Sequence, residues 1–180
     1  DISSWSIKKR IQNGFCYIPE NRSEVGTAAQ NSIWENLVMR IFAHKDFSKF
    51  GFLNLNNLKK YSQNIINKYE IVNPGLNQPA AVLSGGNLQK LILGREIEIN
   101  GEVYVFIHPT RGLDISSTFF VRGKIQELSE KGKKVIVISG DLDELFEISD
   151  KIAVMYEGKI MDQLDRNQFD TQKIGLLMSG

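Results

Sequence analysis

The stretch "AAVLSGGNLQKLILGREI", residues 80–97, places Ser-Gly-Gly immediately before a strongly helical run. Two explanations fit it. Either a plain loop precedes a helix capped by Ser84, or the start of the helix presents bare main-chain amides to an anion. Gly85 and Gly86 remove side chains at this point. The first amides of a helix lack internal partners and carry the positive end of its dipole, which suits phosphate.

Strands and helices alternate on both sides of this turn. Continuous apolar runs predict buried strands at residues 15–19, 103–107, 134–139 and 151–161, the last turning at Glu157–Gly158. Helical patterns lie at residues 7–14, 88–99, 116–132, 141–149 and 170–179. This order predicts an α/β fold, with a parallel sheet covered by helices on both faces.

Residues 30–82 interrupt this order and predict an inserted α-helical subdomain. Residues 33–69 are mainly helical with a Gly- and Asn-rich break, and residues 71–82 contain two prolines and a glycine that predict an irregular connection. We therefore expect an α/β core from residues 1–29 and 83–180, with the helical subdomain between them.

The composition excludes several classes of protein. The 180 residues are 42% hydrophobic and 24% charged, with a net charge of +1, which argues against a nucleic-acid partner. Cys16 is the single cysteine, so an internal disulfide is excluded and a reducing compartment is favoured. No apolar run approaches the roughly 20 residues that span a membrane, and no signal peptide opens the chain. We expect the chain to reach a membrane only by docking to another protein.

Three motifs follow one another in a fixed order: LSGGN at 83–87, PTRGLD at 109–114 and ISGDLDE at 138–144. Together they resemble the ATP-binding subunits of ABC transporters. LSGGN resembles the signature motif, PTRGLD the segment after the Walker B strand with its D-loop, and ISGDLDE the switch-histidine segment. The variant GGN-x-QK, with PTRGLD and YIPENR at 17–22, is similar to sugar and nucleoside importers. The match covers nearly the whole chain and resembles the second of two tandem domains.

This resemblance implies a P-loop NTPase-like (RecA-like) fold, ATP and Mg²⁺ as cofactors, and a place on the cytoplasmic face of a membrane. The partners would be membrane permease subunits and either the first nucleotide-binding domain or a second copy. Each ATP in the family lies between the Walker motifs of one domain and the signature of the other.

The resemblance also assigns roles to individual residues. The Ser84 hydroxyl and the Gly85 and Gly86 amides would bind the partner's γ-phosphate, within a signature that runs from Leu83 to Asn87. Glu20 occupies the Q-loop position. Asp114 is the D-loop aspartate that reaches across the dimer, the N-cap of the next helix, or both.

The chain departs from the family pattern at its own catalytic positions. No G-x-x-x-x-G-K-[ST] motif is present, so the chain resembles a fragment that begins after its Walker A motif. Ile107 and His108 stand where the family has Asp and Glu, and Gly140 replaces the switch histidine. Isoleucine cannot hold Mg²⁺, which needs oxygen ligands, so we expect no metal site here. The domain should complete its partner's ATP site and be catalytically poor at its own.

Two other functions remain open. The departures at the catalytic positions favour a non-catalytic scaffold or interaction module on the same fold. A DNA-repair or translation-factor ATPase of the same superfamily is opposed by the motif variant and the near-neutral charge.

Two structural alternatives are also open. Aromatic residues of the insertion pack in its core or form a face that docks to the transporter's membrane helices: Trp34, Phe42, Phe47, Phe50 and Phe52. By resemblance, the absent P-loop strand belongs between strands 134–139 and 151–156, which would be left with a gap or would pair directly. An unpaired apolar edge predicts self-association.

Overall fold

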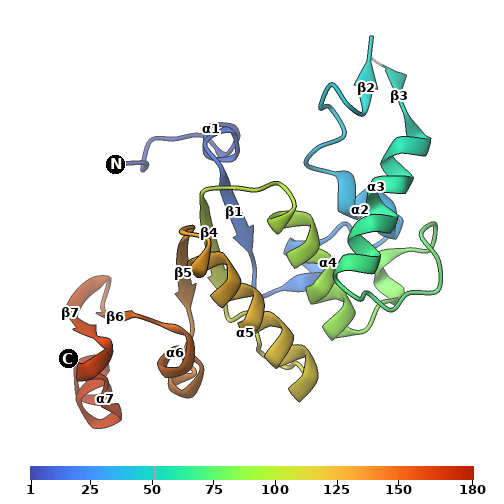
Figure 1. Cartoon of the computed structure of the whole chain (residues 1–180). Helices are drawn as coiled ribbons and strands as arrows, with labels where there is room; N and C mark the ends of the chain where they lie inside the picture. Colours follow the sequence, from blue (N-terminus) through green and yellow to red (C-terminus); the bar gives the residue numbers. More distant parts are fainter. Residues whose placement is uncertain (51) are drawn as a thin grey trace. The chain divides into compact units, whose positions relative to one another are not determined.

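Three of the expected strands form one parallel sheet in the order β1–β4–β5 (Figure 1). The computed structural model of the chain describes residues 1–50 and 52–180, which divide into two compact units, 1–138 and 139–180. The sheet of the first unit consists of β1 (Phe15–Ile18), β4 (Val103–Ile107) and β5 (Lys134–Ile138). The parallel pairing confirms the predicted α/β class.

The two faces of this sheet are covered to different extents. On the central strand, Tyr104 and Phe106 point to one face and are both 0% exposed. On β5, Ile136 and Ile138 lie in register with the alternate residues of β4 and are 51% and 50% exposed. Within the described residues of the first unit, one face of β4 is therefore buried, and the isoleucines on the opposite face of β5 are half-exposed.

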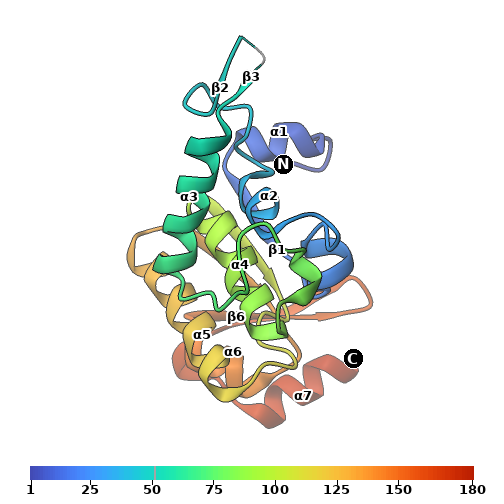
Figure 2. The same cartoon turned by 90° about the vertical axis from the view of Figure 1, so that its right-hand side faces the viewer.

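Helix α4 (Gly85–Ile97) is the central helix of the first unit (Figure 2). It begins at Gly85 rather than near Leu88, because the Ser84 side chain caps it. The buried residues of α4 lie on several sides of the helix, because α2, α3, α5, η1 and β1 all contact it. At Gly94, an added β-carbon would lie 2.6 Å from Ile65 Cγ2, so the glycine allows α3 to pack closely.

Two helices of the expected insertion are present and pack on each other and on α4. The segment contains α2 (Ile33–Val38), β2 (Ser48–Lys49), β3 (Phe52–Leu53), α3 (Leu55–Lys68) and the 3₁₀ turn η2 (Ala80–Val82). The short β2–β3 hairpin replaces the simple break that the sequence predicts. Because residues 1–138 form one unit, a separate subdomain bounded at residues 30 and 82 stays a prediction.

Residues 20–31 contain a π-helical turn, η1 (Arg22–Gly26). An added β-carbon at Gly26 would lie 2.6 Å from Ile92 Cδ1, so η1 is seated directly on α4. The unit also contains α1 (Ile7–Gln12), capped by Ser6, and α5 (Ile115–Glu130).

The second unit is a hairpin with two helices. It consists of α6 (Leu142–Ile148), β6 (Lys151–Tyr156), β7 (Lys159–Asp165), the 3₁₀ turn η3 (Arg166–Gln168) and α7 (Thr171–Ser179). The hairpin turns at Glu157 and Gly158, both with positive φ, as the sequence predicts. Strand β6 pairs antiparallel with β7. Whether a gap separates strands 134–139 and 151–156 or the two pair directly stays a prediction.

Candidate functional site

The start of α4 is open on its outer side. Ser84 and Gly85 are exposed, while Leu83, Gly86 and Asn87 are partly buried. Ser84 Oγ accepts hydrogen bonds from the Asn87 main-chain N–H at 3.4 Å and from Asn87 Nδ2 at 2.9 Å. The turn is thus held from within its own helix and leaves its outer surface accessible.

The two glycines of the turn have different surroundings. An added β-carbon at Gly85 would meet no atom within 4 Å, so this position faces open space. The same atom at Gly86 would lie 2.4 Å from Ser117 Oγ and 3.4 Å from Asp114 Oδ2. Gly86 therefore permits close packing of α4 against the start of α5, and only Gly85 keeps the outer surface bare.

Asp114 caps α5, as one of the two predicted roles requires. Its carboxylate accepts the Ser117 main-chain N–H at 2.9 Å and the hydroxyls of Ser117 and Ser116, each at 2.7 Å. These three bonds, led by the main-chain bond from Ser117, hold the pKa of Asp114 well below its usual range. The close approach to Gly86 places this exposed carboxylate beside the open turn.

The Asn87 side chain is occupied within the chain. Besides its bond to Ser84, its Oδ1 accepts the Val72 main-chain N–H at 2.8 Å. Asn87 thus fastens the segment after α3 to the start of α4. Leu83 precedes the turn and donates its N–H to the Ala80 carbonyl at 3.1 Å.

Glu20 lies beside the loop that follows β4, where it pairs with Arg111. Nearby, Arg22 Nε donates to Gln89 Oε1 at 2.8 Å, and Arg22 Nη2 donates to the Arg111 carbonyl at 2.6 Å. Gln89 Nε2 in turn donates to the Pro109 carbonyl at 2.9 Å. We call these four side chains, with the Pro109 and Arg111 carbonyls, the arginine clamp.

The sequence predicts a role for Glu20 but none for the other three members of the clamp, Arg22, Gln89 and Arg111. The available signal was the presence of opposite charges in YIPENR and PTRGLD. Burial lowers the pKa of the Arg22 guanidinium, while the charge of Glu20 acts in the opposite direction.

The positions that depart from the family pattern lie at or just after the carboxyl ends of β4 and β5. Ile107 ends β4 in register with Ile138. His108 comes next, with φ +43°, and its N–H donates to the Ile138 carbonyl at 2.8 Å. Gly140 follows β5 at the start of the second unit. Carboxyl ends of parallel strands are where such folds bind ligands, but these three side chains offer no carboxylate oxygen.

A magnesium ion therefore does not fit the residues at this position. The ion prefers oxygen ligands, and the carboxylate of Glu20 is already paired with Arg111. In the part of the chain that the structure describes, no three His, Cys, Asp or Glu side chains gather closely enough to hold a metal.

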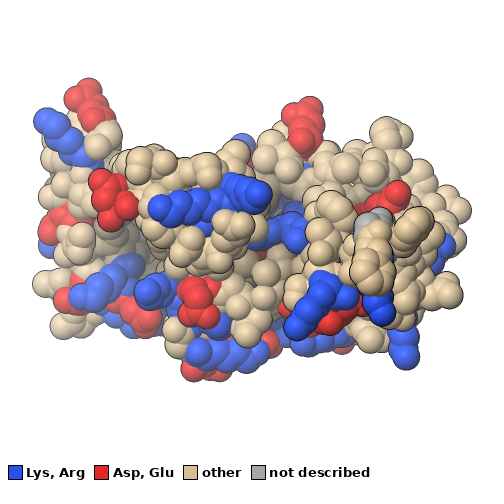
Figure 3. Space-filling view, turned by 90° about the horizontal axis from the view of Figure 1, so that it is seen from above, with Lys and Arg blue, Asp and Glu red and all other residues tan. Residues whose placement is uncertain are grey.

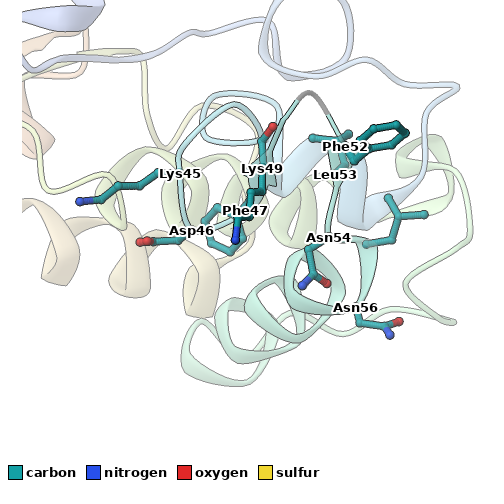
Figure 4. Close-up of a pocket in the computed structure, with 10 residues that line it drawn as sticks. Lys45, Asp46, Phe47, Lys49, Phe52, Leu53, Asn54 and Asn56 are labelled. Carbon is teal, nitrogen blue, oxygen red and sulfur yellow. The ribbon is translucent and has the colours of Figure 1, made fainter.

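The aromatic residues of the β2–β3 region divide between packing and exposure. Phe47 packs edge-on against Tyr61 of α3, with ring centres 5.3 Å apart. Phe50 and Phe52 are 90% and 81% exposed. Phe52 also lines an open hollow between the hairpin and the start of α3 (Figure 4). Core packing thus explains Phe47, and the docking hypothesis remains for Phe50 and Phe52.

Comparison with known proteins finds relatives along the whole chain. The guanosine import ATP-binding protein NupO of Bacillus subtilis (strain 168) is 35% identical over 179 residues, which are 99% of this chain and 35% of that protein. The chain's homologues are ABC ATP-binding proteins of nucleoside and sugar importers. The nucleoside import protein NupA of Lactococcus lactis subsp. cremoris is 31% identical, and the ribose import protein RbsA of Streptococcus agalactiae 32%, each over 100% of this chain and 36% of the relative.

The chain spans about 36% of the length of these ABC import proteins. No protein-family model matches the sequence. No helix in the described residues is long and apolar enough to cross a membrane. Figure 3 shows positive and negative side chains interspersed on one face, in keeping with the net charge of +1.

Solved structures establish the fold of the ABC cassette independently. A dimeric post-hydrolysis structure of the ATP-binding cassette MJ0796 with ADP and Pi has a TM-score of 0.69 and covers 88% of this chain and 65% of its own. A second dimeric structure of MJ0796, described as a bacterial ABC transporter cassette, has a TM-score of 0.71. The match covers 90% of this chain and 67% of the MJ0796 chain. Both are 18% identical, so they show the fold alone, and they confirm the predicted P-loop NTPase-like class.

Proposed function

We propose that this chain supplies the signature side of an ATP site shared with a partner nucleotide-binding domain, in an importer that couples ATP hydrolysis to uptake of a sugar or nucleoside. The open start of α4 carries this proposal, because Ser84 and Gly85 are exposed while Asn87 and Gly86 hold the turn from behind. The relatives' names, which specify import of guanosine, nucleosides and ribose, support the class of cargo.

The chemistry of the turn suits the γ-phosphate of a nucleotide bound by the partner. Both hydrogen bonds at Ser84 Oγ use the oxygen as acceptor, so the hydroxyl proton is left to donate to a phosphate oxygen. The amides of the first turn and the dipole of α4 add favourable interactions with negative charge. Donors held in place before reaction stabilise charge that develops during phosphoryl transfer.

The chain's own catalytic positions contribute little to hydrolysis in this proposal. Ile107, His108 and Gly140 supply neither a metal ligand nor a positioned base, so any Mg²⁺ enters with the ATP on the partner's Walker motifs. The two ATP sites of the assembled pair would therefore be unequal.

Membrane permease subunits are the second proposed partner and would hold the chain at the cytoplasmic face of the membrane. Phe50 and Phe52 are the proposed docking residues, because their rings are exposed and Phe52 lines the hollow at the β2–β3 hairpin. The proposal makes this hairpin the point at which the transporter contacts the domain.

An ATPase assay with a partner domain that has intact Walker motifs tests the proposal. We expect the partner to hydrolyse ATP only when this chain is added, and Ser84→Arg to lower the rate by about 10²–10³-fold, as loss of oxyanion donors does elsewhere. Ser129→Arg, at the exposed far end of α5, is the matched control and should leave the rate unchanged.

A non-catalytic scaffold is the second candidate function, favoured by Ile107, His108 and Gly140. The same assay separates the two candidates. If the partner binds this chain but its ATPase rate does not respond to the chain or to Ser84→Arg, the scaffold is correct and the signature assignment fails.

A further inference from the structure

We infer that Arg22 is a positioning residue that locks the signature helix α4 to the loop carrying Asp114, an inference that rests on the proposed function. Arg22 bonds to Gln89 of α4 and to the Arg111 carbonyl, three residues before Asp114. Its role is to keep Ser84 and Asp114 in one fixed arrangement.

Gln89 is the buried centre of the arginine clamp. Its side chain is 0% exposed, and both ends of its amide are satisfied, by Arg22 at 2.8 Å and by the Pro109 carbonyl at 2.9 Å. Loss of Arg22 would leave a buried carbonyl oxygen without a partner, which costs more than an exposed hydrogen bond does. The amide of Gln89 also lies five residues along α4 from Ser84, so its position sets that of the turn.

Arg111 closes the clamp from the other side. Its carbonyl accepts from Arg22 at 2.6 Å, and its guanidinium pairs with Glu20, two residues before Arg22. Arg22 thus reaches from residues 20–22 to residues 109–111, and Arg111 reaches back from residues 109–111 to residues 20–22. Residues 20–22 and 109–111 are thereby tied together by charged groups, which make stronger hydrogen bonds than neutral ones.

The segment carrying Arg22 is itself anchored. Thr27 Oγ1 donates to the Arg22 carbonyl at 2.9 Å, and Gly26 packs against Ile92 of α4. π-Helical turns of this kind are rare and often occur at functional sites. Because these contacts hold the main chain of residues 22–27 in place, the Arg22 guanidinium can restrain the position of α4.

Three motifs of the sequence supply all four side chains of the clamp. YIPENR supplies Glu20 and Arg22, GGN-x-QK supplies Gln89, and PTRGLD supplies Arg111. In the proposed dimer, Glu20 and residues 109–111 lie at this chain's own ATP site, whereas α4 serves the partner's. The clamp therefore connects the two sites mechanically through residues that need not touch either nucleotide.

Amide hydrogen exchange on the 180-residue chain tests the positional part of the inference. We expect Arg22→Met to speed exchange about tenfold in residues 84–90 and 110–114, the usual scale for a lost hydrogen bond to a buried group. Arg22→Lys should give a smaller effect in the same segments, because one ammonium group cannot reproduce the planar fork. Gln89→Leu, which removes the centre of the clamp and leaves the Pro109 carbonyl without its donor, should speed exchange in residues 110–114.

Arg10→Met is the matched control. Arg10 is also partly buried and donates to two main-chain carbonyls, those of Ile2 and Trp5, but it lies outside the clamp. The Arg10→Met variant should leave exchange in residues 84–90 and 110–114 unchanged. Folded Arg22→Met and Gln89→Leu variants with unaltered exchange in both segments would overturn the inference.

The partner-stimulated ATPase assay tests the functional part. Arg22→Met should lower kcat about tenfold and leave KM for ATP unchanged, because Arg22 holds the turn and does not bind nucleotide. An equal loss in Arg10→Met, or a change confined to KM, would contradict a positioning role. If Ser84→Arg has no effect in the same assay, the proposed function fails, while the exchange result still decides whether the clamp holds α4.

Discussion

At the scale of single residues, Asp114 combines a structural and a proposed functional role. Its three hydrogen bonds depress its pKa, so the folded state binds a proton there less readily than the unfolded chain does. The stabilisation is present in full above the ordinary carboxyl pKa, about 3.9, and is lost as the pH falls below it. Urea unfolding should show that Asp114→Asn lowers the midpoint at pH 7 and that its difference from the parent narrows towards pH 3. A difference that stays constant over this range would contradict the assignment.

At the scale of elements, the contact between α4 and α5 gives the two glycines of the turn different roles: Gly86 lies at this contact and Gly85 does not. Gly86→Ala should destabilise the fold by about 1 kcal/mol, because the methyl group displaces Ser117 from Asp114 and outweighs the helix propensity of alanine. Gly85→Ala meets open space, so it should be neutral or slightly stabilising, yet it should lower partner-stimulated ATPase activity. Thermal unfolding and the ATPase assay together check both variants. Equal stability losses in the two would show that Gly86 is not a packing residue.

Local patterns in the sequence predict elements better than they predict contacts between them. The apolar run at 103–107 and the turn at Glu157–Gly158 lie where expected, because strand burial and hairpin chemistry are encoded locally. The clamp joins segments 67 and 89 residues apart, and no local pattern records such pairing. The same holds for position 86, which requires glycine because Ser117 on another helix leaves no room for a β-carbon there. The local sequence around Gly86 does not show this contact.

At the scale of the whole molecule, β5 has an unpaired side within the described residues and half-exposed isoleucines at 136 and 138. Apolar edges of this kind pair with other chains. We predict that the 180-residue chain forms dimers or larger oligomers in light scattering, and that Ile136→Lys with Ile138→Lys shifts it towards monomer. A strictly monomeric parent chain at high concentration would contradict the prediction.

The proposed function requires the open turn at Ser84 and Gly85 to contact a nucleotide held by a neighbouring domain. The most direct measurement is the amide NMR signal of Gly85 during titration with a partner domain loaded with ATP under conditions that block hydrolysis. The Gly85 signal should shift with the ATP-loaded partner and stay in place with the empty partner, while that of Gly175 on α7 does not respond. Binding of the ATP-loaded partner with an unmoved Gly85 signal would contradict the account.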